Sequence, residues 1–169
     1  MFLIEPCCTQ KQIPALYSKL GEDRTTFFHG YGDLSIAELL PVFLTRYSET
    51  ELTIVAPFLP DRAAKVLQKI MEKTNLTSNG KDKKNAIRRL VLVTDLRKKK
   101  SPIASQWLSE NPFGERLVLK NIQQNDTVIM FPDIALYGPV NLIYGGHFTG
   151  IATKNKKTIS TLREVYETL

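Results

Sequence analysis

The chain has 169 residues, of which 43% are hydrophobic and 24% are charged, a composition that is ordinary for one globular domain. No apolar run approaches the roughly 20 residues that a membrane-spanning helix needs, and the opening MFLIEPCC lacks the basic flank of a signal peptide. We therefore predict a cytoplasmic protein in which the adjacent Cys7 and Cys8 are buried or half-buried thiols, not a disulfide or a metal site.

The formal net charge of +6 comes from one segment of the chain. Residues 81–100 carry nine Lys or Arg against two Asp, a net charge of +7, which leaves the other 149 residues at −1. A local basic segment on a neutral protein favours contact with a polyanion such as nucleic acid. The alternative is a solvated charged loop.

Helix and strand patterns alternate from about residue 25 onward. The short apolar run at 25–29 predicts a first strand. Ser35 and Glu38 have the spacing of a capping box, which predicts a helix that runs to about Tyr47. Pro41 falls inside this helix and predicts either a kink or a later start.

The middle of the chain contains two continuous apolar runs, LTIVA at 52–56 and LVLVT at 90–94. Such runs are typical of strands that are buried on both faces of a sheet. A helix is predicted between them over 61–73, and Ser101 followed by Pro102 is a strong start signal for the next helix.

The last third reads as short strands that end in a helix. A strand at 117–120, a hairpin over 127–137 and one further strand precede a helix capped by Asn155. The order β-α-β-α-β-α-β-β-β-β-α predicts an α/β fold with a mixed, mainly parallel sheet flanked by helices. We expect a single domain, with an N-terminal extension at 1–24 and the α/β core at 25–169.

The tetrapeptide GPVN at 138–141, with the strands around it, resembles the second half of a phospholipase D-like domain. In that family a His-x-Lys strand is followed by a strand ending in Gly-Ser-x-Asn, a loop, another strand and a C-terminal helix. Aligning GPVN with Gly-Ser-x-Asn places Gln124 at the histidine, Asp126 at the lysine and Pro139 at the serine. Only the glycine and Asn141 match.

The resemblance implies a family mechanism that these residues do not support. Two His-x-Lys motifs, from two halves or two subunits, act on one phosphodiester: one histidine attacks phosphorus and the other protonates the leaving oxygen. Gln124 can neither attack nor transfer a proton, and Asp126 repels a phosphate. We therefore predict a catalytically degenerate protein that acts as a binding or scaffolding module, with nucleic acid as a partner. The resemblance also implies a homodimer.

The two histidines of the chain offer a different interpretation. His29 and His147 each stand beside glycine, and together with Asp33 they could form an active phosphodiesterase or nuclease site outside the usual motif. A metal would need a carboxylate from Asp33, Asp126 or Asp133, and we predict no metal or cofactor site. A third interpretation is a protein-interaction module without a ligand, in which the cations only maintain solubility.

Two clusters of cations flank the strand at 90–94, and we expect them at opposite ends of the sheet. The later cluster follows the carboxyl end of the strand, where open parallel sheets bind ligands, and precedes the helix that begins at Ser101. We predict that this cluster makes the nucleic-acid contacts, through Arg97, Lys98, Lys99 and Lys100. The earlier cluster is Lys81, Lys83 and Lys84.

Overall fold

The computed structural model describes residues 4–5, 16–18, 20–30, 34–76, 86–96 and 101–169. Its strands are β1 (Ile4–Glu5), β2 (Thr25–Gly30), β3 (Glu49–Ala56), β4 (Ala86–Thr94), β5 (Leu117–Asn121), β6 (Val128–Met130), β7 (Ala135–Tyr137) and β8 (Phe148–Thr153). They form one eight-stranded sheet in the order β1-β2-β8-β7-β6-β3-β4-β5. The predicted neighbours, including the hairpin of β6 and β7 beside β3, therefore lie in one sheet.

The sheet is mixed, as the sequence predicts, but its parallel part is smaller than expected. Among the described strands, β1–β2, β3–β4 and β4–β5 are parallel pairs, whereas β2–β8, β8–β7, β7–β6 and β6–β3 are antiparallel. The prediction of a mainly parallel sheet is corrected in this respect. The reason is that β2 does not pair with β3, because β8, β7 and β6 lie between them in the sheet.

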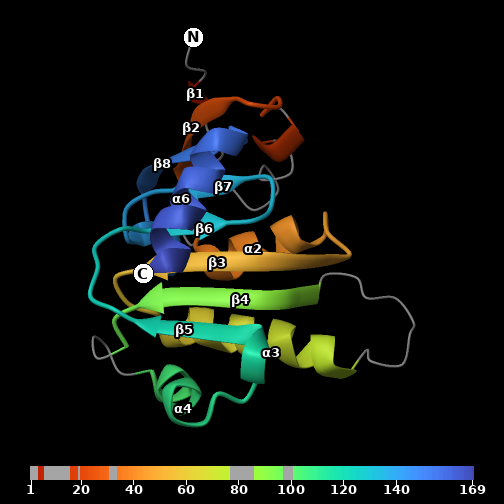
Figure 1. Ribbon diagram of the computed structural model, residues 1–169. Coiled ribbons are helices and arrows are strands. Elements are labelled where there is room, and N and C mark those ends of the chain that lie inside the picture. Colours follow the sequence, from red (N-terminus) through yellow and green to blue (C-terminus); the bar gives the residue numbers. More distant parts are fainter. Residues whose placement is uncertain (1–3, 6–15, 19, 31–33, 77–85, 97–100) are drawn as a thin grey trace.

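Helices cover both faces of the sheet (Figure 1). The helix α6 (Lys156–Thr168) lies on one face and packs on the smaller of two apolar clusters. Within the described residues, the opposite face carries the larger cluster and the helices α2 (Ile36–Leu44), α3 (Asp61–Leu76), α4 (Pro102–Glu110) and α5 (Asn141–Tyr144). A short 3-10 turn, η2 (Gly114–Arg116), precedes β5.

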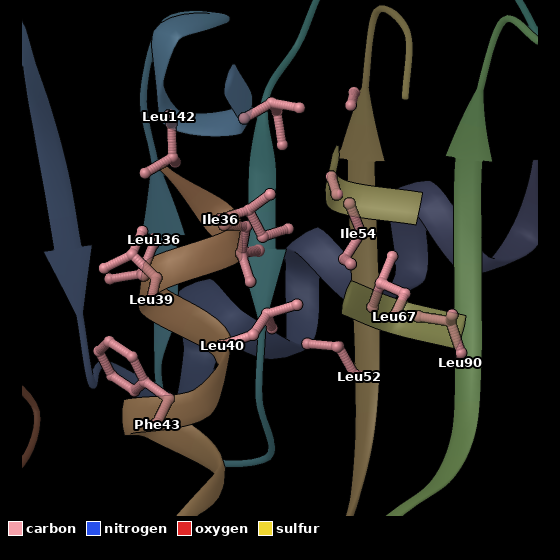
Figure 2. Packing of buried hydrophobic residues seen from close by; sticks show 14 of the residues in the cluster. Ile36, Leu39, Leu40, Phe43, Leu52, Ile54, Leu67, Leu90, Leu136 and Leu142 are labelled. Atoms are coloured by element: carbon pink, nitrogen blue, oxygen red, sulfur yellow. The ribbon is translucent and has the colours of Figure 1, made fainter. Parts of the chain in front are cut away.

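The larger cluster forms where α2 and α3 meet the central strands. Leu52 and Ile54 of β3, Leu90 of β4, Leu40 of α2 and Leu67 of α3 are all at most 1% exposed, and Figure 2 shows them converging between the helices and the sheet. Alternate residues of β3 and β4 point to the smaller cluster under α6. Because both faces are covered there, the segments 52–56 of β3 and 90–94 of β4 are almost entirely apolar.

The first long helix starts where the sequence predicts. The Ser35 side chain caps α2 while Glu38 accepts from the Ser35 backbone N–H at 2.9 Å, so the capping box forms. The helix begins at Ile36 and continues through Pro41. The later start that Pro41 suggested is therefore wrong.

Part of the N-terminal extension packs against the core. The hydroxyls of Tyr17 and Tyr47 both donate to the Asp133 carboxylate, in the turn between β6 and β7. Burial, followed by this hydrogen bond, raises the pKa of both tyrosines. The Arg46 guanidinium and the Lys154 ammonium lie 3.9 and 3.7 Å from the centroid of the Tyr17 ring.

Candidate functional site

At one edge of the sheet lie the carboxyl ends of β2, β3, β4, β5 and β7, together with the first residues of β6 and β8. We call it the strand-end edge. The pairs that define it are Ala56 with Thr94, Thr94 with Asn121, Val55 with Val128, Val128 with Tyr137, and Gly30 with Phe148. Ligands of open α/β sheets bind outside such strand ends, so a bound ligand is expected at this edge.

Gln124 lies in the loop between β5 and β6, just outside the strand-end edge. Its amide nitrogen donates to the backbone oxygens of Val93 at 3.5 Å and Asp126 at 3.1 Å, and its amide oxygen accepts from the Asp126 N–H at 3.2 Å. Both ends of the side chain amide are therefore used to hold the loop in shape and to tie it to the end of β4.

Asp126, two residues further on, is bound by the C-terminal helix. Its carboxylate accepts from the Tyr166 hydroxyl at 2.6 Å, and Tyr166 is only 7% exposed. Burial, followed by the hydrogen bond to Asp126, raises the pKa of Tyr166. The last turn of α6 is held in place by Lys120, whose ammonium donates to the Glu167 backbone oxygen at 2.6 Å.

The chain turns away from the sheet directly after β7. The Gly138 N–H donates to the Thr127 oxygen at 3.1 Å, and Pro139 is exposed in the turn that leads into α5. Asn141, the first residue of α5, donates from its side chain to the His147 backbone oxygen at 3.0 Å. The amide thus closes the loop between α5 and β8.

That loop depends on two glycines. Gly145 and Gly146 have φ values of 97° and 117°, in the left-handed region that favours glycine. A Cβ at Gly146 would also lie 3.3 Å from the Asn141 amide nitrogen. The pair GG before His147 is therefore required by the geometry of the loop.

The structure brings the two histidines to the same edge. His29 lies on β2 opposite Thr149 of β8, and its Nδ1 is 2.9 Å from the Thr149 hydroxyl. His147 is exposed and lies immediately before β8. Asp33, the third member of this predicted group, lies outside the described residues.

The predicted nucleic-acid contacts, Arg97–Lys100, lie outside the described residues, but both flanking positions are defined. On one side, the Leu96 N–H donates to the Asn121 side chain oxygen at 3.0 Å. On the other, Ser101 is 3% exposed and its hydroxyl donates to Asp61 at 3.0 Å. Hydrogen bonds from Lys65 and then Ser101 hold the pKa of Asp61 below its ordinary value. Both flanks of the cluster are therefore fixed at the strand-end edge.

The remaining cations of the basic segment divide into two groups. Lys81, Lys83 and Lys84 lie outside the described residues. Arg88 and Arg89 pair with carboxylates, Arg88 with Glu51 and Arg89 with Glu167 at 3.6 Å. Each of these two positive charges is partly neutralised by its carboxylate. The two arginines of β4 therefore attract an anion less strongly than unpaired arginines would.

The sequence analysis missed Tyr166, the residue that binds Asp126. A signal was present, because Tyr166 lies seven residues after the buried Ile159 and so falls on the same stripe of α6. A tyrosine on a buried stripe needs a partner for its hydroxyl. The identity of that partner, 40 residues earlier in the chain, had no local signal.

Within the described ranges, no group of three or more His, Cys, Asp or Glu side chains is arranged to hold a metal ion. No helix in the same ranges combines the length and apolarity that crossing a bilayer requires.

Comparisons with protein-family models and with curated proteins gave no match. Among solved structures, the chain is similar to TrmBL2, an archaeal chromatin protein whose structure shows a novel mode of DNA binding, at 10% identity and a TM-score of 0.45, over 94% of this chain and 57% of that one. It is also similar to NucT from Helicobacter pylori, at 14% identity and a TM-score of 0.49, over 84% of this chain and 94% of that one. The chain thus spans little more than half of TrmBL2, and neither likeness assigns a function.

Proposed function

We propose that this chain is a catalytically degenerate phospholipase D-like protein that binds nucleic acid at the strand-end edge without hydrolysing it. The observation that carries the proposal is the use of Gln124 and Asp126 in internal hydrogen bonds. At these positions the resemblance places the nucleophilic histidine and the phosphate-binding lysine. Here both side chains stabilise the fold instead.

The chemistry of these residues supports the absence of hydrolysis. A phosphohistidine mechanism needs a neutral imidazole to attack phosphorus and cations to stabilise the charge on the equatorial oxygens. The Gln124 amide is neither a nucleophile nor a proton carrier, and the Asp126 carboxylate adds negative charge where a cation is required. Pro139 removes the hydroxyl that the family places beside them.

The charge of the basic segment supports nucleic acid as the partner. Four successive cations, Arg97–Lys100, stand in the sequence between Leu96 and Ser101, and both of these described residues are held by hydrogen bonds at this edge. A cluster held at both flanks loses less conformational freedom on binding than a free tail does. Contacts to phosphates would be independent of sequence and sensitive to salt. We also propose a homodimer, which sedimentation equilibrium of the purified chain tests.

The second candidate is an active phosphodiesterase, and one observation favours it. His29 lies on β2, and His147 lies immediately before the neighbouring strand β8 at the same edge. In that function one imidazole would attack or activate water, and the other would protonate the leaving oxygen.

One incubation distinguishes the two candidates. A fluorescein-labelled DNA duplex is mixed with the purified chain, binding is followed by anisotropy, and strand length is then read on a denaturing gel. We expect binding with an intact strand. Cleavage that disappears in His147→Ala would overturn the proposal in favour of the phosphodiesterase, whereas cleavage that persists in His147→Ala, purified identically, marks a contaminating nuclease. Absence of both binding and cleavage would favour the module without a ligand.

A further inference from the structure

A pocket of about 330 Å³ lies at the edge of the sheet opposite the strand-end edge. Its lining comes from the first residues of β3, from β4, from the turn after β6 and from α6, and consists of Glu49, Thr50, Glu51, Arg88, Pro132 and Arg163. We call it the opposite-edge pocket. Its volume is at the lower end of the roughly 300–1,000 Å³ of ligand pockets, which suits one small molecule.

The charges of the lining are balanced. The lining contains two basic residues, Arg88 and Arg163, and two acidic residues, Glu49 and Glu51, and Arg88 already pairs with Glu51. Because the four charges sum to zero, the lining favours neither an inorganic anion nor a cation alone. A molecule that carries one charge of each sign meets a partner for both.

The β-bulge in β4 sets one side of the pocket. The register between β3 and β4 shifts between Thr50 and Glu51, so that Arg88 is the extra residue on β4. This places Arg88 beside Glu51, with which it forms an ion pair. A bulge re-aims a side chain relative to the regular strand, and here it turns a cation toward the pocket.

Arg163 forms the other side of the pocket, and not all of its N–H donors are used in hydrogen bonds within the described residues. One terminal nitrogen donates to the Phe131 backbone oxygen at 2.9 Å. Its Nε is buried without a hydrogen-bond partner among the described residues, so a ligand in the pocket does not reach that atom. The second terminal nitrogen is not among the buried atoms and makes no hydrogen bond within the described residues, so it is the donor that Arg163 offers to the pocket. A carboxylate is the acceptor whose geometry a guanidinium matches best.

The turn that carries Pro132 is rigid. The Phe131 ring stacks on Tyr47 with a centroid distance of 5.5 Å and an interplanar angle of 3°. On the other side of Pro132, Asp133 accepts from the hydroxyls of Tyr17 and Tyr47. Because both neighbours of Pro132 are fixed, this wall of the pocket is formed before any ligand arrives.

We propose that the opposite-edge pocket binds a free α-amino acid, with its carboxylate on Arg163 and its ammonium group between Glu49 and Glu51. The assignment does not rest on nucleic-acid binding, because no residue of the pocket lies at the strand-end edge. It gives the protein a small-molecule site at the end of the sheet opposite the strand-end edge.

The test is a titration of the full-length protein followed by amide NMR shifts of Thr50, Glu51 and Arg88. The probes are the standard free α-amino acids, each to about 10 mM, together with their N-acetyl amides and sodium phosphate. We expect saturable shifts from at least one free amino acid, with a Kd below about 1 mM, and none from its N-acetyl amide, which lacks both charges.

Two variants assign the charges, and a third is the control. Arg163→Gln and Glu51→Gln should each weaken binding at least about tenfold, whereas Lys65→Gln, an exposed change on α3, should leave it unaltered. Glu51 is partly exposed, so its variant tests the site even if Arg163→Gln impairs folding. Saturable shifts from none of the amino acids, equal binding of the N-acetyl amide, or tighter binding of phosphate would each overturn the proposal.

Discussion

Replacing Tyr166 by Phe removes one hydroxyl and keeps the ring in the smaller apolar cluster. The hydroxyl donates to the Asp126 carboxylate at 2.6 Å. Hydrogen bonds to charged groups contribute about 1.5–3 kcal/mol, and Asp126 is partly exposed, so water can replace part of the loss. We therefore expect Tyr166→Phe to lower the free energy of unfolding by about 1–2 kcal/mol and Tm by about 3–6 °C.

Urea unfolding followed by tryptophan fluorescence measures this change. Trp107 is the single tryptophan of the chain and is 1% exposed, so its emission reports the loss of the core. The matched control is Tyr137→Phe, because Tyr137 is 42% exposed and its change should stay within about 0.5 kcal/mol. Combining Tyr166→Phe with Asp126→Ala should show a coupling energy of about 1 kcal/mol.

The same pair predicts a dependence on alkaline pH. Burial and then Asp126 raise the pKa of Tyr166 above its ordinary value of 10.0. A raised folded pKa favours the neutral phenol, so this stabilisation is fully present below pH 10 and is lost as the pH rises through the folded pKa. Wild-type protein should therefore lose stability above pH 10 more steeply than Tyr166→Phe, by at most about 1.4 kcal/mol per pH unit.

Two results together would refute this reasoning. Tyr166→Phe would change the free energy of unfolding at pH 7 no more than Tyr137→Phe does, and its stability above pH 10 would fall as steeply as that of the wild type. Asp126 would then not be held by α6. The position that corresponds to the family's lysine would be available for other contacts, and the main support for a degenerate site would be lost.

Three further changes test the packing around the strand-end edge and in the turn between β6 and β7. Gly30→Ala should destabilise by about 1–3 kcal/mol, because its Cβ would lie 2.1 Å from the Phe148 ring, and adding Phe148→Leu should recover part of the loss in thermal melts. Gln124→Ala should cost about 1–3 kcal/mol in urea titrations, whereas the exposed neighbour Gln123→Ala should change stability by less than about 0.5 kcal/mol. Asp133→Ala removes the acceptor of two tyrosine hydroxyls; because Asp133 is exposed, water replaces part of the loss, and we expect a cost of about 1–2 kcal/mol in the same titrations. A cost below about 0.5 kcal/mol would show that these hydrogen bonds do not fix the turn.

The elements that the sequence predicted are those whose position depends on residues close together in the chain. The apolar runs LTIVA and LVLVT form the carboxyl-terminal parts of β3 and β4, because strand segments that are covered on both faces require apolar side chains. The cap at Ser35 fixed the start of α2, and Asn155 fixed that of α6, where its side chain accepts from the Thr158 N–H at 2.8 Å. Such caps act through residues two or three positions away, so the sequence displays them directly.

The features that escaped prediction depend on distant residues or on very short elements. The four-residue helix α5 and the two-residue strand β1 are too short to show a periodic pattern. The order of strands in the sheet, which placed β8 beside β2, is set by packing across the whole core. The Asp126–Tyr166 contact joins residues 40 positions apart, and no local rule connects them.

The central claim, nucleic-acid binding through Arg97–Lys100, is tested most directly by the salt dependence of duplex DNA affinity. Four phosphate contacts predict a log–log slope of roughly −3.6 and a loss on the order of 100-fold in affinity between about 50 and 200 mM salt. Changing Arg97, Lys98, Lys99 and Lys100 to Ser should weaken binding and flatten the slope, while changing Lys81, Lys83 and Lys84 should do less. No binding at about 50 mM salt, or a slope unchanged by the 97–100 substitution, would contradict the account.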